Sequence, residues 1–299
     1  MAVTPERRNP GPSWGYSLVL FGLRVLPGWM VVFGEGFGAL VALLLMTSQR
    51  RASRAYLQTV LPGRIGFKDQ WKHFFAFTQY LIDRLRLGHG ESFPIAFAEG
   101  YGDSFWPLAK GNDPVLYGTF HLGYSDLLGF LLSDVQQHIH MVRLKVDNSS
   151  DTENLGKQFG NISFVWVNDK ENLVWAMKNA LRDGNSLAMQ CDRAEFSTKQ
   201  GAFSFLGAKR IFPFTIYNLS SICRVPVIFA YAVRKANGEV ECFHSVPFSP
   251  EGLSRKEVLL EGARHFQEVL NHVERLLKDY PYQWFNFCPM NDPLPSSDV

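Results

Sequence analysis

The chain has 299 residues, of which 46% are hydrophobic, and it carries a net charge of only +2. Its length suffices for one large core, so one α/β domain with an N-terminal appendage is the simplest organisation. The near-neutral charge excludes the strongly basic surface typical of a nucleic-acid-binding protein. Four cysteines without C-x-x-C spacing indicate reduced thiols in a cytoplasmic domain, rather than a disulfide framework.

The first predicted element is an apolar N-terminal region, residues 14–46, which is interrupted by Arg24, Pro27 and Glu35. Its second part, residues 28–46, has only Glu35 charged and comes close to the ~20 apolar residues of a spanning helix. The region is long and lacks a clear small-residue cleavage site, which argues against a signal peptide. We therefore predict membrane attachment, with the segment either spanning the bilayer or lying in its interface. The alternative is a pair of buried helices that cap a soluble domain.

Basic residues flank this apolar region. Residues 1–54 hold six arginines and two glutamates, a net charge of +4, which leaves −2 for the rest of the chain. Arg50, Arg51 and Arg54 follow the apolar region, and a basic cluster at that point is expected on the cytoplasmic side of a membrane. We expect three parts: a membrane-associating segment over residues 1–48, a globular domain over 49–290 and a flexible tail over 291–299.

The rest of the chain alternates helical and strand patterns. Strand-like runs separated by helical patterns predict βαβ units and a mainly parallel sheet flanked by helices. Asn237-Gly238 lies between two strand-like runs and predicts a β-hairpin with an antiparallel edge. The predicted helices cover residues 50–59, 71–87, 124–132, 150–159, 169–182 and 254–279, and the predicted strands cover residues 115–120, 139–146, 162–167, 186–190, 225–233 and 240–246.

His121 stands at the end of the first predicted strand, and Asp126 follows in the first turn of the next predicted helix. In open α/β sheets, ligands bind in the crevice at the carboxyl ends of the strands. An imidazole there can act as a general base, and a carboxylate five residues further on can hold its tautomer and stabilise the imidazolium. The pair is a candidate catalytic dyad. The alternative is a hydrogen-bonded strand-end histidine near a carboxylate that the helix dipole favours.

Charged residues also follow two later strands. Arg143 lies near the end of the second predicted strand, where a guanidinium can hold a phosphate or carboxylate bidentately, unless it is an ordinary ion-paired arginine. Asp192 and Arg193 follow the fourth strand. The loop predicted over residues 200–213 offers backbone amides and cations to an anionic group. Its relevant residues are Gly201, Gly207, Lys209 and Arg210.

Taken in chain order, the segments that carry these candidate residues resemble the bacterial lipid A biosynthesis acyltransferases of the lauroyl/myristoyl type. These enzymes belong to the lysophospholipid acyltransferase superfamily. The resemblance covers roughly residues 15–288. The phosphate-binding F-P-E-G loop of glycerol-phosphate acyltransferases is absent, which points away from that branch. The matching features are the H-x4-D block at 121–126, Arg143 before Asn148, Asp192 before a Gly-Phe-Phe-Gly-like loop, and the Trp-containing segment 281–287.

The resemblance implies transfer of a fatty acyl chain from a thioester to a hydroxyl or amine of a membrane glycolipid of the lipid A type, without a metal or redox cofactor. His121 would be the base, and Asp126 would orient it. An acyl carrier protein or coenzyme A would carry the donated acyl chain. The protein would be located at the cytoplasmic face of the inner membrane. The alternatives are an ornithine lipid or lipid-linked pigment as acceptor, or lipid binding without catalysis. The substrate-binding residues would be Arg143, Asn148, Asp192, Arg193, Lys209 and Arg210.

Other reaction types lack a motif in the sequence. Residues 123–127 fail the G-x-S-x-G pattern of a nucleophile elbow at its last position. The sequence has no Walker A loop, no G-x-G-x-x-G after a strand, no H-E-x-x-H and no Cys/His metal spacing. A metal held by His121 and Asp126 would lack an evident third ligand.

Overall fold

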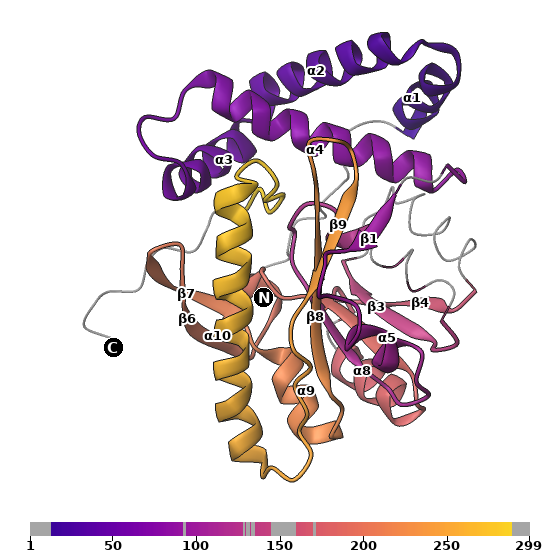
Figure 1. Ribbon diagram of the computed structural model, residues 1–299, viewed down its shortest axis with the longest axis vertical. Helices are drawn as coiled ribbons and strands as arrows, with labels where there is room; N and C mark the ends of the chain where they lie inside the picture. Colours follow the sequence, from indigo (N-terminus) through magenta and orange to yellow (C-terminus); the bar gives the residue numbers. More distant parts are fainter. Residues whose placement is uncertain are drawn as a thin grey trace.

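A computed structural model describes residues 13–91, 94–127, 129, 132, 135–144, 160–169 and 172–288. It confirms the predicted α/β class, because helices flank a mostly parallel seven-stranded sheet (Figure 1). The strand order is β1-β9-β8-β2-β5-β3-β4. The bounds are Ile95–Phe97 (β1), Leu116–Thr119 (β2), Ile139–Arg143 (β3), Ile162–Trp166 (β4), Ser186–Gln190 (β5), Val227–Arg234 (β8) and Val240–His244 (β9).

Five neighbouring strands of the sheet are parallel, whereas the pair β8 and β9 is antiparallel. The neighbouring strands β8, β2, β5, β3 and β4 all run in the same direction. β9 pairs antiparallel with β8 across the predicted hairpin, where Gly238 has a φ of 90° that suits glycine. β8 is buried over all but its last residue, as expected for a strand whose two faces are both covered.

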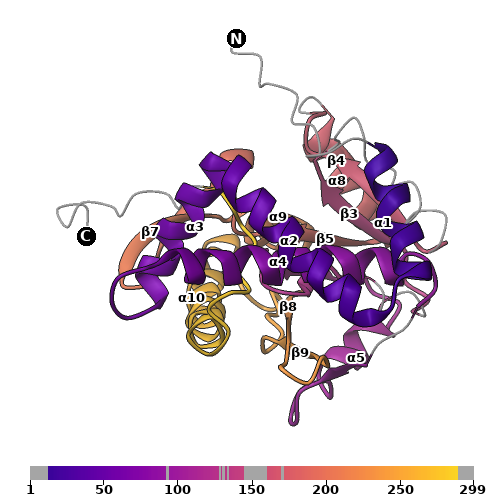
Figure 2. The ribbon, with the colours of Figure 1, turned by 90° about the horizontal axis from the view of Figure 1, so that it is seen from above.

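Helices cover both faces of the sheet (Figures 1 and 2). Strand side chains alternate between the two cores, so Leu116 joins the first core and its neighbour Tyr117 the second. The first core includes α8 (Leu173–Arg182), α9 (Thr215–Cys223) and α10 (Arg255–Asp279), and the second includes α4 (Phe67–Leu87) and α5 (Phe105–Ala109).

α4 also lies across the carboxyl ends of the parallel strands. The Tyr80 hydroxyl donates a hydrogen bond to Asp126, and Asp83 accepts one from the Tyr124 hydroxyl. These bonds place α4 directly over the loop that follows β2. Three helices precede α4, and α2 lies along the side of α4 that faces away from the sheet (Figures 1 and 2). They are α1 (Ser13–Val25), α2 (Gly28–Leu45) and α3 (Thr47–Val60).

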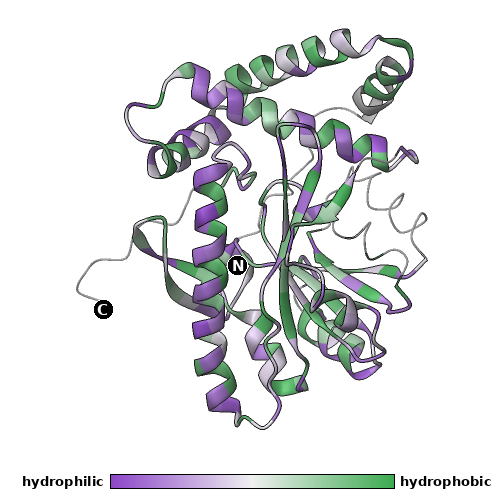
Figure 3. Cartoon of the chain, viewed as in Figure 1, coloured by the Kyte–Doolittle hydropathy of each residue, from purple (hydrophilic) through white to green (hydrophobic). Residues whose placement is uncertain are grey.

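α2 buries only a narrow stripe of side chains. The buried residues recur every four positions: Val31, Glu35, Ala39 and Leu43. The helix is mostly hydrophobic (Figure 3). Most of its other large apolar side chains are exposed, including Trp29 at 72%, Phe33 at 74% and Leu45 at 74%. Within the described residues, α2 alone is long and apolar enough to cross a bilayer, judged by length and composition, and 17% of it is buried. Most of α2 is therefore exposed rather than buried.

Two predicted elements differ from the structure. The predicted helix 124–132 begins as a 3-10 turn, η1 (Ser125–Leu127). The predicted loop 200–213 is a β-hairpin, β6 (Gln200–Phe205) and β7 (Ala208–Pro213), because alternate apolar residues of β6 pack toward α10. Leu206 and Gly207 form its tight turn, both with positive φ. The predicted helix 150–159 and the tail 291–299 lie outside the described residues.

Candidate active site

His121 and Asp192 meet at the carboxyl edge of the sheet. β2 and β5 are neighbours with Thr119 opposite Gln190, so the residues that follow each strand emerge side by side. Asp192 Oδ1 lies 2.8 Å from His121 Nδ1, and Asp192 Oδ2 accepts the backbone N–H of His121 at 3.0 Å. The carboxylate therefore holds both the backbone and the ring of the histidine.

Asp192 determines which nitrogen of His121 carries a hydrogen. The Asp192 side chain is 0% exposed and that of His121 is 17% exposed. Burial alone would raise the pKa of Asp192, but the adjacent His121 ring and its hydrogen bonds lower that pKa below its usual value. An ionised carboxylate only accepts hydrogen bonds, so Nδ1 carries the hydrogen and Nε2 keeps its lone pair. In the described part of the chain, no residue makes a hydrogen bond with Nε2.

The C-terminal segment after α10 holds the His121 loop in place. The backbone N–H of Phe285 donates to the carbonyl of His121 at 2.6 Å, and that of Gly123 donates to the carbonyl of Gln283 at 2.6 Å. Gly123 has a φ of 48°, and a Cβ atom there would lie 2.5 Å from the carbonyl oxygen of Ala232. Only glycine fits this position. The loop is thus fixed by backbone contacts from two sides.

Asn286 supports the Asp192 carboxylate. Its Nδ2 donates to Asp192 Oδ2 at 3.2 Å, and its Oδ1 accepts a hydrogen bond from Arg193 Nε at 3.1 Å. Arg193, predicted to bind substrate, therefore contacts the pair through Asn286. The sequence prediction did not include Asn286. Its place in the Trp-containing segment 281–287 was the signal that could have identified it.

Asp126 contacts a separate set of groups. Its Oδ1 accepts a hydrogen bond from Gln190 Nε2 at 2.8 Å, and its Oδ2 accepts one from the Tyr80 hydroxyl at 3.1 Å. Oδ2 also lies 3.4 Å from Arg143 Nη2 and 4.0 Å from Arg84 Nη1. Burial alone would raise the pKa of Asp126, but Arg143 and then Arg84 lower that pKa below its usual value. Asp126 is therefore a carboxylate between two arginines.

The predicted contact between Asp126 and His121 is replaced by the contact with Asp192. Among the described residues, Asp126 makes no hydrogen bond with His121. The chain turns through η1 at residues 125–127, and the Asp126 side chain points toward α4 and β3. The orienting carboxylate thus comes from the neighbouring strand rather than from the same loop.

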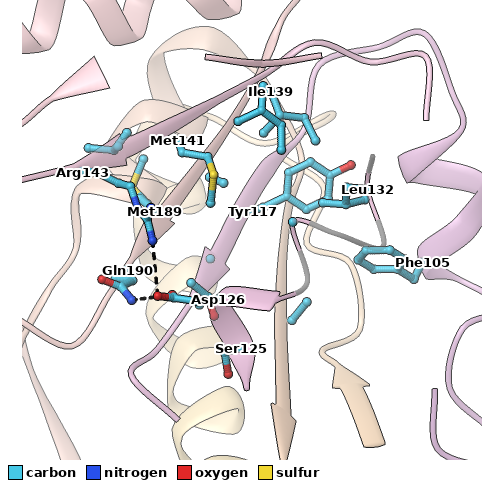
Figure 4. Close-up of a pocket in the computed structure, with 17 residues that line it drawn as sticks. Phe105, Tyr117, Ser125, Asp126, Leu132, Ile139, Met141, Arg143, Met189 and Gln190 are labelled. Carbon is cyan, nitrogen blue, oxygen red and sulfur yellow. Dashed lines mark hydrogen bonds and ion pairs between the residues drawn. The ribbon is translucent and has the colours of Figure 1, made fainter. Parts of the chain in front are cut away.

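An apolar cavity of about 60 Å³ lies beside Asp126. Figure 4 shows Asp126, Arg143 and Gln190 together at one end of it, joined by hydrogen bonds or ion pairs. Apolar side chains from several elements line the rest: Phe105, Tyr117, Leu132, Ile139 and Met141 (Figure 4). The cavity therefore has a charged end and a hydrocarbon-like interior.

The structure does not bring the remaining predicted residues to His121. Lys209 and Arg210 lie in β7, and no contact in the described part of the chain joins either of them to His121. Arg210 is buried, and its Nε donates to the carbonyl of Phe205 within the same hairpin. Asn148 lies outside the described residues. Arg143 is at the predicted crevice position, at the end of β3, where it forms an ion pair with Asp126.

Three further residues of the site were not predicted from the sequence: Tyr80, Arg84 and Gln190. Tyr80 and Arg84 are four residues apart on α4, so they lie on one face of the helix. That spacing, in a helix predicted only from its apolar face, was the available signal. Gln190 is the last residue of β5 and is directly opposite Thr119.

The site provides the oriented imidazole of His121, whose Nε2 has no hydrogen-bond partner among the described residues. It also provides the guanidinium of Arg143 at one end of an apolar cavity and the ionised carboxylates of Asp126 and Asp192. Within the described residues, no group of three or more His, Cys, Asp or Glu side chains is placed to hold a metal ion. The sequence matches none of the protein-family models and none of the curated proteins with which it was compared.

Proposed function

We propose that the protein is a membrane-associated acyltransferase that moves a fatty acyl chain from a thioester donor to a hydroxyl or amine of a membrane lipid. One observation carries the proposal. The His121 Nδ1–H is held by the buried Asp192 carboxylate at 2.8 Å, while Nε2 has no hydrogen-bond partner among the described residues. This is the arrangement of a general base. The resemblance to the lipid A acyltransferases selects acyl transfer among the reactions that use such a base.

The proposed reaction begins when Nε2 of His121 removes the proton of the acceptor hydroxyl or amine. The acceptor atom attacks the thioester carbonyl and forms a C–O or C–N bond. The tetrahedral intermediate then loses the thiolate, and the imidazolium gives the acceptor's proton to this thiolate to form the thiol. Asp192 stabilises the imidazolium in both steps, because its carboxylate already holds Nδ1–H. The protonated histidine is neutralised at the end of each cycle.

The cavity places an apolar environment beside the charged groups, but at about 60 Å³ it is too small for a whole acyl chain. Its interior is lined by hydrocarbon and aromatic side chains, and Asp126 at its charged end lies on the same loop as His121. The guanidinium of Arg143 at that end is 20% exposed and can contact an anionic group of donor or acceptor. Asp126 sets the position of that guanidinium. We assign Arg143 to substrate binding and Asp126 to holding Arg143 and Arg84.

The N-terminal helices support attachment to a membrane. α2 exposes large apolar side chains along the face that points away from α4. α4 carries charged residues at both ends, among them Lys68, Asp69 and Arg86. If α2 crossed the bilayer while packed along α4, these charges would enter the hydrocarbon, which is costly. We therefore infer that α2 lies in the plane of the interface, on the cytoplasmic face of the inner membrane. The catalytic edge of the sheet then faces the lipid.

The test follows a labelled acyl chain from acyl carrier protein, and in parallel from coenzyme A, to an inner-membrane lipid extract. Wild-type protein should label one lipid class, and mass spectrometry of that class identifies the acceptor as a lipid A precursor, an ornithine lipid or a lipid-linked pigment. His121→Ala should abolish the labelling. Lipid binding without transfer, equal in wild type and His121→Ala, would replace the acyltransferase by a lipid-binding protein.

A further inference from the structure

A basic hollow lies at the end of the N-terminal layer, away from the His121 site. It has a volume of about 630 Å³ and is formed by the first half of α3, the α3–α4 connection and the first turn of α4. We refer to it as the arginine hollow. Its lining residues are Arg50, Arg51, Arg54, Arg64, Ile65, Gly66, Phe67 and Gln70. The lining thus contains four cations and no carboxylate.

No carboxylate in the described part of the chain compensates these charges. None of the four arginine side chains takes part in a hydrogen bond or ion pair with a described residue. Residues 47–66 contain four arginines and no acidic residue. The next acidic residue, Asp69, is engaged elsewhere, since its carboxylate accepts hydrogen bonds from Gly66 N–H and from the Tyr282 hydroxyl. The hollow also lies at the N-terminus of the long helix α4, where the helix dipole favours an anion.

Exposed apolar residues occur in the lining of the hollow and in the chain just before α3. Phe67, in its lining, is 56% exposed. α3 begins two residues after Leu45, and Leu44 and Leu45 are 54% and 74% exposed. Figure 1 shows α3 and the start of α4 at one end of the layer that α2 forms. An anionic group in the hollow would therefore have exposed hydrocarbon next to it, on the same side of the molecule.

From this combination we infer that the arginine hollow binds the phosphate of an anionic membrane lipid, while the lipid's acyl chains lie against the exposed face of α2. Guanidinium groups hold phosphate bidentately, and the adjacent apolar side chains match the hydrocarbon that continues from a headgroup. An acidic soluble protein, such as a carrier protein, would match the charge but not the exposed phenylalanine and leucines. The inference rests on the membrane attachment proposed above and is independent of acyl transfer.

The test measures binding of the full-length protein to vesicles by flotation. One set of vesicles is phosphatidylcholine alone, and the other contains phosphatidylglycerol in addition. Wild type should bind both and prefer the anionic set. Arg54→Gln/Arg64→Gln should bind the anionic set roughly 30-fold more weakly, since each arginine near an anionic surface contributes about fivefold, and should bind phosphatidylcholine like wild type.

The matched control is Arg255→Gln/Lys256→Gln, which removes the same charge at the far end of α10, where both side chains are exposed. It should bind both vesicle sets like wild type. Equal loss in the two double variants would mean a diffuse charge effect and would overturn the site. Unchanged anionic binding in Arg54→Gln/Arg64→Gln would do the same, and so would failure of wild type to bind any vesicle.

Two competing ligands are tested with the same variants. Weaker binding of acyl carrier protein to Arg54→Gln/Arg64→Gln, with vesicle binding intact, would assign the hollow to that partner instead. Saturable binding of inorganic phosphate that the variant loses, again with vesicle binding intact, would assign it to a free anion. A failed acyl-transfer assay leaves all these binding measurements unaffected, so the two proposals fail separately.

Discussion

Two histidines that contact the same C-terminal segment have opposite surroundings. His121 has one nitrogen on a carboxylate and the other without a partner among the described residues. His73, on α4, is 1% exposed, and both of its nitrogens are bonded: Nε2 to the carbonyl of Trp284 at 2.7 Å and Nδ1 to Ser53 Oγ at 2.9 Å. A carbonyl only accepts, so Nε2 of His73 carries the hydrogen and Nδ1 accepts from the serine.

The difference separates a reactive histidine from a structural one. Burial lowers the pKa of His73 to about 4, and no carboxylate among the described residues opposes this shift. His73 therefore stays neutral and connects α3, α4 and the C-terminal segment. His121 Nδ1 instead lies 2.8 Å from the Asp192 carboxylate. The partner of each ring, more than the residue type, decides whether it can exchange a proton.

The largest predicted effect comes from replacing each of the two histidines by alanine in turn. His121→Ala should lower the rate of acyl transfer by ~10⁴-fold, because it removes the general base, and should leave the protein folded with a lower melting temperature, because the buried Asp192 carboxylate loses one partner. His73→Ala should instead keep most of the activity per folded molecule and lower the melting temperature. Single-turnover transfer from acyl carrier protein and calorimetry measure the two effects. Near-wild-type turnover in His121→Ala would remove the distinction.

A second pair of variants compares the two carboxylates at the site. Asp192→Asn should lower the rate by ~10³ to 10⁴-fold, comparable with the change in the corresponding protease triad, because the amide can hold the wrong tautomer of His121. Asp126→Asn should have a much smaller effect on the rate. It leaves Arg143 and Arg84 without their carboxylate, so its main effects should be weaker substrate binding and a loss of about 2 kcal/mol of stability.

The steady-state parameters measure this second comparison. Asp192→Asn should reduce kcat, whereas Asp126→Asn should chiefly raise KM for the anionic substrate. If Asp126→Asn reduced kcat as strongly as Asp192→Asn, the carboxylate five residues after the histidine would also act on the reacting groups, as the sequence motif implies. Asp126→Glu serves as the charge-preserving control.

The third prediction concerns the pH dependence of stability that His73 causes. The unfolded chain binds a proton at His73 below about pH 6.5, but the folded protein resists this until about pH 4, so the unfolded state binds more protons between those values. Stability therefore falls as the pH decreases through this window. Between pH 7 and pH 5 the loss from His73 alone should be about 2 kcal/mol.

Urea unfolding of wild type and His73→Gln at the two pH values measures this loss. The variant should be less stable at pH 7 and should show a smaller decrease toward pH 5, since glutamine does not titrate. The carboxylates contribute equally to both proteins and cancel in the difference. If the stability of the two proteins decreased equally from pH 7 to pH 5, His73 would bind a proton as easily in the folded protein as in the unfolded chain. That result would contradict the prediction.

The smallest predicted effect concerns the hydrogen bond that Asn286 donates to Asp192. Asn286→Ala removes one hydrogen bond to the carboxylate and also the acceptor of Arg193 Nε. Because His121 itself still holds Asp192 through two groups, the rate should fall by only roughly tenfold. Asn286→Asp is the informative companion: a second carboxylate beside Asp192 repels it and should lower activity further than alanine does. A Michaelis constant changed at constant kcat would place Asn286 on the substrate instead.

Local patterns in the sequence predicted six of the strands, with ends that differ by up to three residues, but not β1, β6 or β7. The run over 186–190 is β5 to the residue, and Asn237-Gly238 is the turn between β8 and β9. His121 was placed correctly after β2 because apolar runs of strand length and turn residues are local signals. The hairpin β6–β7 was missed because its alternating pattern is short and contains Lys209 and Arg210, which were interpreted as a loop that binds anions.

Only the tertiary structure decided which groups reach each other. Asp192 is 71 residues from His121 in the chain, and Asn286 is 94 residues from Asp192. The β2–β5 register and the path of the C-terminal segment bring these three together, and neither can be inferred from spacing along the chain. The composition of α2 indicated attachment to a membrane. Which face of α2 is exposed, however, depends on which face packs against α4. Sequence periodicity specifies the conformation of each element, whereas the contacts between elements depend on packing free energy summed over the whole core.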